Sequence, residues 1–251
     1  MEISLAKRTA LVTGAGRGLG KAMAIAFAQS GADLILIDLD FASAEKASKE
    51  ISAMGRKAAA FRADVSRKEE VDEVVKQAIE RFGRVDILVN NAGIIFRKPM
   101  LEYAENDWDQ VINVNLKGTF NFCYAVGKQM ITQHYGRIIN IASIMGDVAL
   151  PPRASYCASK GGVIMLTKEL ATEWAKYGIT ANSISPGWMM TELTEKLFAQ
   201  EEVRKFFLER IPLNRFGTRD DVANLAVFLA SDQSAYITGQ NIFVDGGWTT
   251  Q

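Results

Sequence analysis

The sequence has few of the residues on which several common chemistries depend. Its 251 residues include one histidine, two cysteines and five prolines. A lone histidine, His134, excludes a zinc site built on several histidines, and neither Cys-x-x-Cys nor His-Glu-x-x-His occurs. No Gly-x-Ser-x-Gly elbow accompanies His134, which disfavours a serine hydrolase. The two cysteines, Cys123 and Cys157, do not make a disulfide framework.

Charge and hydropathy exclude further classes of protein. The chain carries 29 basic and 29 acidic side chains, so its formal net charge is zero and nothing implies a surface for nucleic acid. No apolar run is long enough to cross a membrane, and residues 1–8 lack the apolar core of a signal peptide. We therefore expect a cytoplasmic protein whose partner is a small molecule rather than a nucleic acid or a membrane.

Short β-rich runs alternate with longer helical patterns along the chain. This alternation predicts one domain, residues 1–251, built as a Rossmann-type doubly wound parallel sheet of seven strands with helices on both faces. An amphipathic stretch at 188–217 interrupts the alternation, and we interpret it as a substrate lid or as an ordinary surface helix pair. The expected strands are Thr9–Thr13, Asp33–Asp38, Lys57–Phe61, Val85–Asn90, Gly136–Ser143, Ile179–Ser185 and Asn241–Asp245, and the expected helices lie near 18–30, 41–54, 67–82, 105–134, 153–177 and 219–231.

A glycine-rich turn joins the first expected strand to the first expected helix. Glycines let a backbone approach a pyrophosphate, and the start of a helix offers free N–H groups. The glycines are spaced Gly-x-x-x-Gly-x-Gly, which is neither the strict Gly-x-Gly-x-x-Gly fingerprint nor a P-loop. The place of the turn between strand and helix predicts a dinucleotide site formed by Gly14, Arg17, Gly18, Leu19 and Gly20.

Two residues give opposite indications about the cofactor. Asp38 ends the second expected strand, where its carboxylate can accept hydrogen bonds from both adenosine ribose hydroxyls and would repel a 2′-phosphate. Arg17, beside the glycine turn, could instead hold a 2′-phosphate. No second basic residue stands beside Asp38, so the sequence favours NAD and leaves NADP open.

One serine, one tyrosine and one lysine are placed for proton transfer. Ser143 ends a strongly apolar run, and Tyr156 and Lys160 follow it four residues apart, on one face of the expected helix. A lysine ammonium beside a phenol lowers the phenol pKa from about 10, which makes Tyr156 a plausible general acid/base. Tyr124 and Lys128 have the same spacing but no serine thirteen residues before the tyrosine, and we interpret them as a helix pair with an exposed lysine.

Taken together, the motifs resemble the short-chain dehydrogenase/reductase family over nearly the whole chain. The resemblance implies hydride transfer between a nicotinamide and a carbonyl or secondary alcohol. It also implies a homotetramer in which the helices at 105–134 and 153–177 pair through apolar positions such as Phe120, Phe122, Leu166 and Leu170. The resemblance rests on Thr13-Gly14-x3-Gly18-x-Gly20, Asp64-Val65, Asn90-Asn91-Ala92-Gly93, Asn113-Val114-Asn115-Leu116, Ser143, Tyr156-x3-Lys160, Pro186-Gly187 and Val244-Asp245-Gly246-Gly247.

The same resemblance implies a role for each site residue. Asn115 would hold a water by distorting its helix, and Ser143 would orient the substrate oxygen. Tyr156 would transfer the proton, while Lys160 would bind the nicotinamide ribose and keep Tyr156 acidic. Further cofactor contacts are implied for Asp64 and Val65 at adenine, for Asn91, Ala92 and Gly93 at the adenosine ribose, and for Pro186, Gly187, Met189 and Thr191 at the carboxamide.

The substrate is less well defined by the sequence. Within the family the chain is most similar to gluconate 5-dehydrogenase-like and 2-deoxy-D-gluconate 3-dehydrogenase-like members, which implies a sugar acid or a polyol. Arg97 and Arg153 would supply cations for a carboxylate, or each is simply a solvated surface residue.

Two other hypotheses remain. The first is a 3-oxoacyl-[acyl-carrier-protein] reductase, although Gln133-His134-Tyr135 does not form the basic cluster expected to face an acidic carrier. The second is a nucleotide-binding regulator without turnover, which the presence of all four catalytic residues disfavours.

Overall fold

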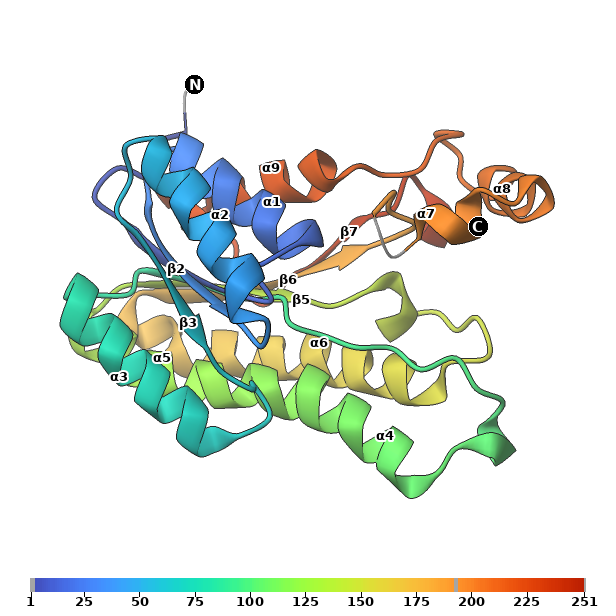
Figure 1. The fold of residues 1–251 in the computed structure, drawn as a ribbon, viewed down its shortest axis with the longest axis horizontal. Helices are drawn as coiled ribbons and strands as arrows, with labels where there is room; N and C mark the ends of the chain where they lie inside the picture. Colours follow the sequence, from blue (N-terminus) through green and yellow to red (C-terminus); the bar gives the residue numbers. More distant parts are fainter. Residues whose placement is uncertain (1–2, 192–193, 251) are drawn as a thin grey trace.

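The computed structural model describes residues 3–191 and 194–250, and a single parallel sheet of seven strands lies at its centre (Figure 1). The strand order is β3-β2-β1-β4-β5-β6-β7. This confirms the predicted doubly wound sheet. The strands are β1 (Thr9–Thr13), β2 (Asp33–Asp38), β3 (Ala58–Arg62), β4 (Ile87–Asn90), β5 (Gly136–Ile141), β6 (Ile179–Pro186) and β7 (Asn241–Val244).

Helices cover both faces of the sheet. In Figure 1, α1, α2 and α9 lie on one side, and α3, α4, α5 and α6 lie on the other. The helices are α1 (Gly18–Gln29), α2 (Phe41–Ala53), α3 (Lys68–Phe82), α4 (Glu105–Ile112), α5 (Gly118–Gln133), α6 (Ala154–Trp174), α7 (Glu195–Phe198), α8 (Glu201–Leu208) and α9 (Arg219–Ala230).

The continuous apolar run in β2 follows from this double cover. Successive side chains of a strand point to opposite faces. Leu34 and Leu36 accordingly pack into the core under α1 and α9, and Ile35 and Ile37 pack into the core on the other face. A strand covered on both sides needs apolar residues at every position, which explains why the run does not alternate.

The structure differs from the sequence prediction at several element ends. The helix expected at 105–134 is divided into α4 and α5 by a π-helical turn, Asn113–Lys117. The strand expected to reach Ser143 ends at Ile141, and Ser143 instead caps the short 3-10 turn Ile144–Gly146. The strand expected from Val85 begins at Ile87, after the buried carboxylate of Asp86 accepts the Thr9 N–H at 2.9 Å.

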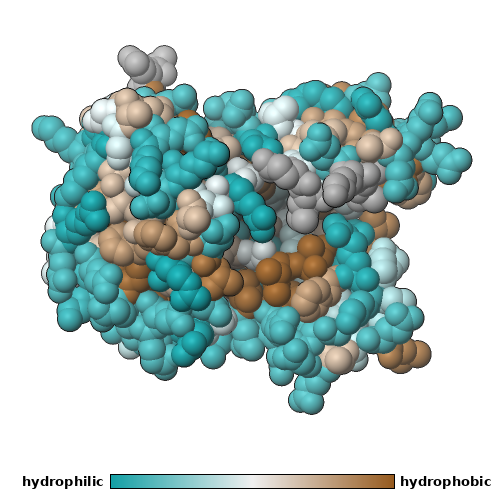
Figure 2. All heavy atoms as spheres, in the orientation of Figure 1, coloured by the Kyte–Doolittle hydropathy of each residue, from teal (hydrophilic) through white to brown (hydrophobic). Residues whose placement is uncertain are grey.

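The apolar residues of the α4, α5 and α6 layer fall into a buried group and an exposed group. Phe122 and Leu170 belong to the core, so they are not available for the subunit contact that the sequence suggested. Phe120 and Met165 are 47% and 62% exposed, respectively. Figure 2 shows mostly hydrophilic side chains on the viewed face, with an apolar band across its middle. Among the described residues, no helix is long and apolar enough to cross a membrane.

The strand order fixes where a ligand can bind. The connections leaving β1 and β4, which are neighbours in the sheet, pass to helices on opposite faces, α1 and α4. Parallel sheets of this kind open a crevice at the carboxyl ends of such a strand pair. The glycine turn after β1 and the Asn91 loop after β4 are therefore the expected sides of this crevice.

Candidate active site

The glycine turn between β1 and α1 is held by Asn91. Its Nδ2 donates to the carbonyl oxygens of Thr13 and Gly14, each at 3.0 Å. A Cβ on Gly20 would lie 2.1 Å from the Gly14 carbonyl oxygen, so only glycine allows α1 to begin this close to the turn. A Cβ on Gly18 would meet nothing within 4 Å, which shows that the turn is open on that side.

The start of α1 fits the diphosphate of a dinucleotide. Arg17 is the N-cap residue and its side chain makes no capping hydrogen bond. The N–H groups of the first helical turn therefore remain for a ligand, and the positive end of the helix dipole favours an anion there. With the open space at Gly18, this arrangement is suited to the cofactor group that the sequence predicts.

Asp38 lies against the same turn. Its Oδ2 accepts the Gly16 N–H at 2.9 Å, and its Oδ1 accepts the Asp40 N–H at 3.0 Å. Hydrogen bonds from Ser43 lower the pKa of Asp40, and the charge of the exposed Arg17 adds to this effect. Asp38, which would repel a 2′-phosphate, and Arg17, which would attract one, thus lie at the same end of the crevice.

The residues expected at the adenine follow β3. Asp64 Oδ1 accepts the backbone N–H and the hydroxyl of Ser66 at 2.9 and 2.7 Å. Val65 is buried against α5, where a Cβ on Gly118 would lie 2.6 Å from its Cγ2. Both residues are therefore fixed in place at the carboxyl end of their strand, where parallel sheets bind ligands.

The segment after β4 contacts both the glycine turn and Lys160 of α6. The N–H groups of Asn91 and Ala92 both donate to the Thr13 hydroxyl, at 3.0 and 3.1 Å. At Gly93 a Cβ would lie 3.6 Å from Lys160 Nζ, so the backbone passes close to that ammonium. In the sequence Thr13 stood out only as part of a motif, whereas in the structure its hydroxyl holds the two sides of the crevice together.

Ser143, Tyr156 and Lys160 meet at the carboxyl end of β5. Ser143 Oγ accepts the Met145 N–H at 3.1 Å and is hydrogen-bonded to the Tyr156 phenol. Lys160 Nζ donates to the carbonyl oxygen of Ile141 at 2.7 Å and lies 5.7 Å from the centre of the Tyr156 ring. The structure therefore brings together the three side chains that the sequence spacing had selected.

The ionisation of this group differs from the sequence prediction. Burial raises the pKa of Tyr156, and the hydrogen bond with Ser143 offsets only part of the rise. Burial also lowers the pKa of Lys160 to about 8. The Tyr156 pKa in this structure is therefore raised rather than lowered, because burial outweighs the groups that lower it. A contribution of the Lys160 charge to this pKa stays a prediction.

Asn115 lies in the π-helical turn Asn113–Lys117, which confirms the predicted distortion of its helix. Its Oδ1 accepts the Ile94 N–H at 2.8 Å, and its Nδ2 donates to the Ile94 carbonyl oxygen at 2.9 Å and to Ser159 Oγ at 3.0 Å. The Ser159 hydroxyl in turn donates to the Tyr156 carbonyl oxygen at 2.8 Å. Asn115 thus joins the loop after β4 to the helix that carries Tyr156.

The charges of two arginines, Arg97 and Arg153, influence the pKa of Tyr156. Burial lowers the pKa of Arg153, which directly precedes α6, and the charge of Arg97 lowers it further. The charges of both arginines also lower the pKa of Tyr156, although Arg97 is exposed. Among the described residues, neither arginine pairs with a carboxylate. Lys98 differs from them, since it forms an ion pair with Asp107 at 2.5 Å.

The segment after β6 contains the expected carboxamide contacts. A Cβ on Gly187 would lie 2.7 Å from the Asp245 Cα, so the backbone passes close to the end of β7. The Thr194 hydroxyl donates to the Met189 carbonyl oxygen at 2.5 Å, and its oxygen accepts the Thr191 N–H at 3.0 Å. Thr194, which the sequence analysis did not identify, therefore fixes this segment.

Residues 188–217 follow the end of β6 at Pro186 and include α7 and α8, and residues 192–193 of this stretch lie outside the described residues. An aromatic cluster joins the stretch to the C-terminal segment. The centre of the Trp188 ring is 4.1 Å from that of Phe207 and 5.5 Å from that of Trp248. The stretch is thus packed over one end of the sheet, and its action as a lid stays a prediction.

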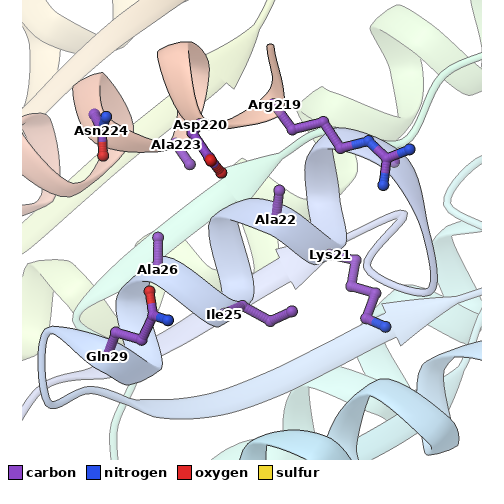
Figure 3. A pocket seen from close by; sticks show the side chains of 10 residues that line it. Lys21, Ala22, Ile25, Ala26, Gln29, Arg219, Asp220, Ala223 and Asn224 are labelled. Atoms are coloured by element: carbon purple, nitrogen blue, oxygen red, sulfur yellow. The ribbon is translucent and has the colours of Figure 1, made fainter. Parts of the chain in front are cut away.

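A cavity of about 520 Å³ lies elsewhere, between α1 and α9 (Figure 3). Figure 3 shows Ala22 and Ala26 of α1 and Ala223 of α9 among its lining side chains. Lys21, which also lines it, forms an ion pair with Glu50 at 2.6 Å. None of Asn115, Ser143, Tyr156 and Lys160 lines this cavity, which shares only its Gly18 end with the glycine turn.

The chain is similar to known proteins over nearly its whole length. A family model described as enoyl-(acyl carrier protein) reductase matches residues 14–249. The chain is 43% identical to a 3-oxoacyl-[acyl-carrier-protein] reductase from Staphylococcus epidermidis over 244 residues, 96% of this chain and 98% of that protein. It is 42% identical to the 2-dehydro-3-deoxy-D-gluconate 5-dehydrogenase of Dickeya dadantii over 249 residues, 98% of this chain and 96% of that protein.

A solved structure is also similar over the full length. It is a gluconate 5-dehydrogenase from Burkholderia cenocepacia in complex with NADP and tartrate. Its TM-score is 0.96 at 38% sequence identity, and the match covers 100% of this chain and 98% of that chain.

Proposed function

The chain belongs to the short-chain dehydrogenase/reductase family, an oxidoreductase family, and from this premise we propose that it is an NAD(P)-dependent dehydrogenase of a gluconate-type sugar acid. The observation that carries the proposal is the pair of arginines, Arg97 and Arg153, which act on the Tyr156 phenol and have no carboxylate partner among the described residues. An uncompensated pair of cations beside the proton-transfer group is suited to an anionic substrate.

In the proposed mechanism the nicotinamide, when bound, supplies or accepts the hydride. Tyr156 gives its phenolic proton to the substrate oxygen in reduction and takes it back in oxidation. Ser143 is hydrogen-bonded to that phenol, so one substrate oxygen can contact both hydroxyls. Because burial raises the Tyr156 pKa, the phenol is protonated at neutral pH and is ready to act as the acid for carbonyl reduction.

Lys160 and Asn115 hold this arrangement. Lys160 lies beside Gly93 at the crevice, where its ammonium can bind ribose hydroxyls. Asn115 fixes the loop after β4 and, through Ser159, the backbone of Tyr156. We assign both residues to positioning and to proton conduction rather than to direct attack on the substrate.

The relatives support two substrate classes. A sugar acid is supported by the relative from Dickeya dadantii and by the tartrate in the structure from Burkholderia cenocepacia, since both names describe carboxylate ligands. A 3-oxoacyl-[acyl-carrier-protein] reductase is supported by relatives at 43% identity and is the second hypothesis. The loop before β5 favours the first, because Gln133 donates to the backbone of Val85 and Tyr135 instead of presenting a basic cluster.

We propose NAD as the preferred cofactor because the Asp38 carboxylate lies at the glycine turn, where it would repel a 2′-phosphate. The NADP named with the structure from Burkholderia cenocepacia supports the opposite preference, and Arg17 is the residue that would provide it. The ratio of kcat/KM for the two cofactors decides between Asp38 and Arg17.

We also propose that the chain forms a homotetramer. The exposed apolar side chains on α4, α5 and α6 support a subunit contact on that layer, because exposed apolar patches mark interaction sites. They are Trp108, Phe120, Tyr124 and Met165. The mass measured by light scattering, with Met165→Glu as the disrupting variant, tests this proposal.

A 340 nm assay of the purified protein tests the function. Gluconate, 5-ketogluconate, a 2-deoxygluconate, glucose and an acetoacetyl thioester are each supplied with NAD(H) and with NADP(H). Turnover of a sugar acid supports the proposal. Reduction of the thioester alone supports the second hypothesis, and no turnover with any compound supports a nucleotide-binding regulator.

A further inference from the structure

Two hydrogen-bond donors next to the candidate site lack an acceptor. Arg153 Nε and Trp188 Nε1 are both buried, and neither has a hydrogen-bond partner among the described residues. The guanidinium carbon of Arg153 lies 5.7 Å from the centre of the Trp188 ring, so the two side chains are neighbours. Buried donors are nearly always paired, and leaving one unpaired costs free energy.

Both side chains are held in position by their other contacts. The Trp188 ring is enclosed by Phe207, Phe198 and Trp248, whose ring centres lie 4.1, 6.4 and 5.5 Å away. Arg153 Nη1 donates to the Met145 sulfur at 3.7 Å. The indole and the guanidinium are therefore oriented before any ligand binds, and binding needs little further ordering of either group.

The surroundings determine which kind of acceptor fits. Arg153 directly precedes the helix of Tyr156, and the positive charge of the exposed Arg97 lowers the pKa of Arg153. A neutral hydroxyl would leave these charges uncompensated, whereas a carboxylate supplies two acceptor oxygens and a negative charge. The indole N–H is a donor only, so it cannot be satisfied by another donor.

We propose that Trp188 and Arg153 together form the subsite for the substrate carboxylate, with Trp188 Nε1 as a specificity-determining donor beside the guanidinium. This inference rests on the proposed sugar-acid function and names the residue that would distinguish acids from neutral sugars.

The test is the substitution Trp188→Phe, which keeps an aromatic ring in the cluster and removes only the donor. The dissociation constant of gluconate from the protein with bound cofactor should rise roughly 10- to 100-fold, as expected for a hydrogen bond to a charged group. The KM of gluconate should rise in parallel, with little change in kcat. The kinetic constants for a neutral polyol should stay within about 3-fold of those of the wild type, because the hydrogen bond to the acid is the interaction removed.

Trp248→Phe is the matched control, since Trp248 belongs to the same aromatic cluster. It should leave gluconate binding unchanged and should match Trp188→Phe in thermal stability. Arg153→Met should weaken gluconate binding at least as much as Trp188→Phe.

The outcomes separate the inference from the function on which it rests. Gluconate binding by Trp188→Phe that equals wild-type binding overturns the subsite even if the wild type oxidises gluconate. Carboxylate binding that weakens in Trp188→Phe, in a protein that turns over no sugar acid, supports the subsite and overturns the proposed function. A wild type that binds neither gluconate nor tartrate overturns the subsite.

Discussion

Replacement of Lys160 with methionine should stabilise the folded protein at neutral pH while it abolishes turnover. The lysine is 4% exposed, and its ammonium donates to a neutral acceptor, the carbonyl oxygen of Ile141, at 2.7 Å. Burial lowers its pKa from 10.5 to about 8. This difference corresponds to roughly 3 kcal/mol by which folding disfavours the charged form. Methionine fills a similar volume without a charge and removes this cost.

The direction of the pH dependence follows from the two pKa values. Below pH 8 the lysine is protonated in both the folded and the unfolded states, and the full cost is present. Between pH 8 and 10.5 the folded state loses its proton first, so the unfolded state binds more protons and wild-type stability rises. The advantage of Lys160→Met in the free energy of unfolding should therefore shrink by roughly 3 kcal/mol across this window.

Urea unfolding at pH 7, 8, 9 and 10, at one protein concentration, measures this difference. Lys128→Met is the control, because Lys128 has the same spacing from a tyrosine but is exposed, with its ammonium 4.3 Å from the centre of the Tyr124 ring. Lys128→Met therefore shows the effect of removing a surface lysine by itself. A Lys160→Met advantage that is constant from pH 7 to 10, or is absent at pH 7, would refute the reasoning.

Four further predictions concern the site. Tyr156→Phe should leave cofactor affinity nearly unchanged in a fluorescence titration and reduce turnover by about 10²- to 10⁴-fold, since it removes only the proton-transfer group; wild-type-like turnover would exclude the mechanism. In the wild type, because burial raises the Tyr156 pKa, alcohol oxidation should gain rate as pH rises, and a rate that falls toward alkaline pH would contradict that role. Asp38→Ala should weaken NAD binding and relax discrimination against NADP in steady-state kinetics, and an unchanged preference would show that another group sets it. Gly20→Ala should abolish dinucleotide binding in calorimetry, because its Cβ would lie 2.1 Å from a carbonyl oxygen. Gly18→Ala is the control, because its Cβ would meet nothing within 4 Å; it should lower the free energy of unfolding only by the roughly 1–2 kcal/mol of a left-handed backbone.

Much of the architecture was readable from local patterns. The apolar run in β2 and the alternation of strands and helices predicted the parallel sheet, because a strand covered on both faces needs apolar residues at every position. The glycine turn and the spacing of Tyr156 and Lys160 were equally local features, since helical geometry alone places residues four apart on one face.

Other features depend on contacts between distant segments. The family resemblance implied a distorted helix at Asn115, but the sequence did not predict that Asn115 would bond with Ile94 and Ser159, which are 21 and 44 residues away along the chain. It also did not identify Thr194, whose hydroxyl fixes Met189, or the unpaired indole of Trp188. These properties arise only when folding brings the segments together.

The sequence by itself thus determined the fold class, and it selected the candidate dinucleotide turn and the candidate proton-transfer residues, because each depends on residue type and short spacing. The tertiary structure decided the ionisation and the surroundings of those residues. Lys160 was expected to lower the pKa of Tyr156, but burial raises that pKa, and the lysine is hydrogen-bonded to Ile141. Burial and charge are set by the whole fold, since they depend on which groups exclude water from a side chain, and no local pattern in the sequence specifies that.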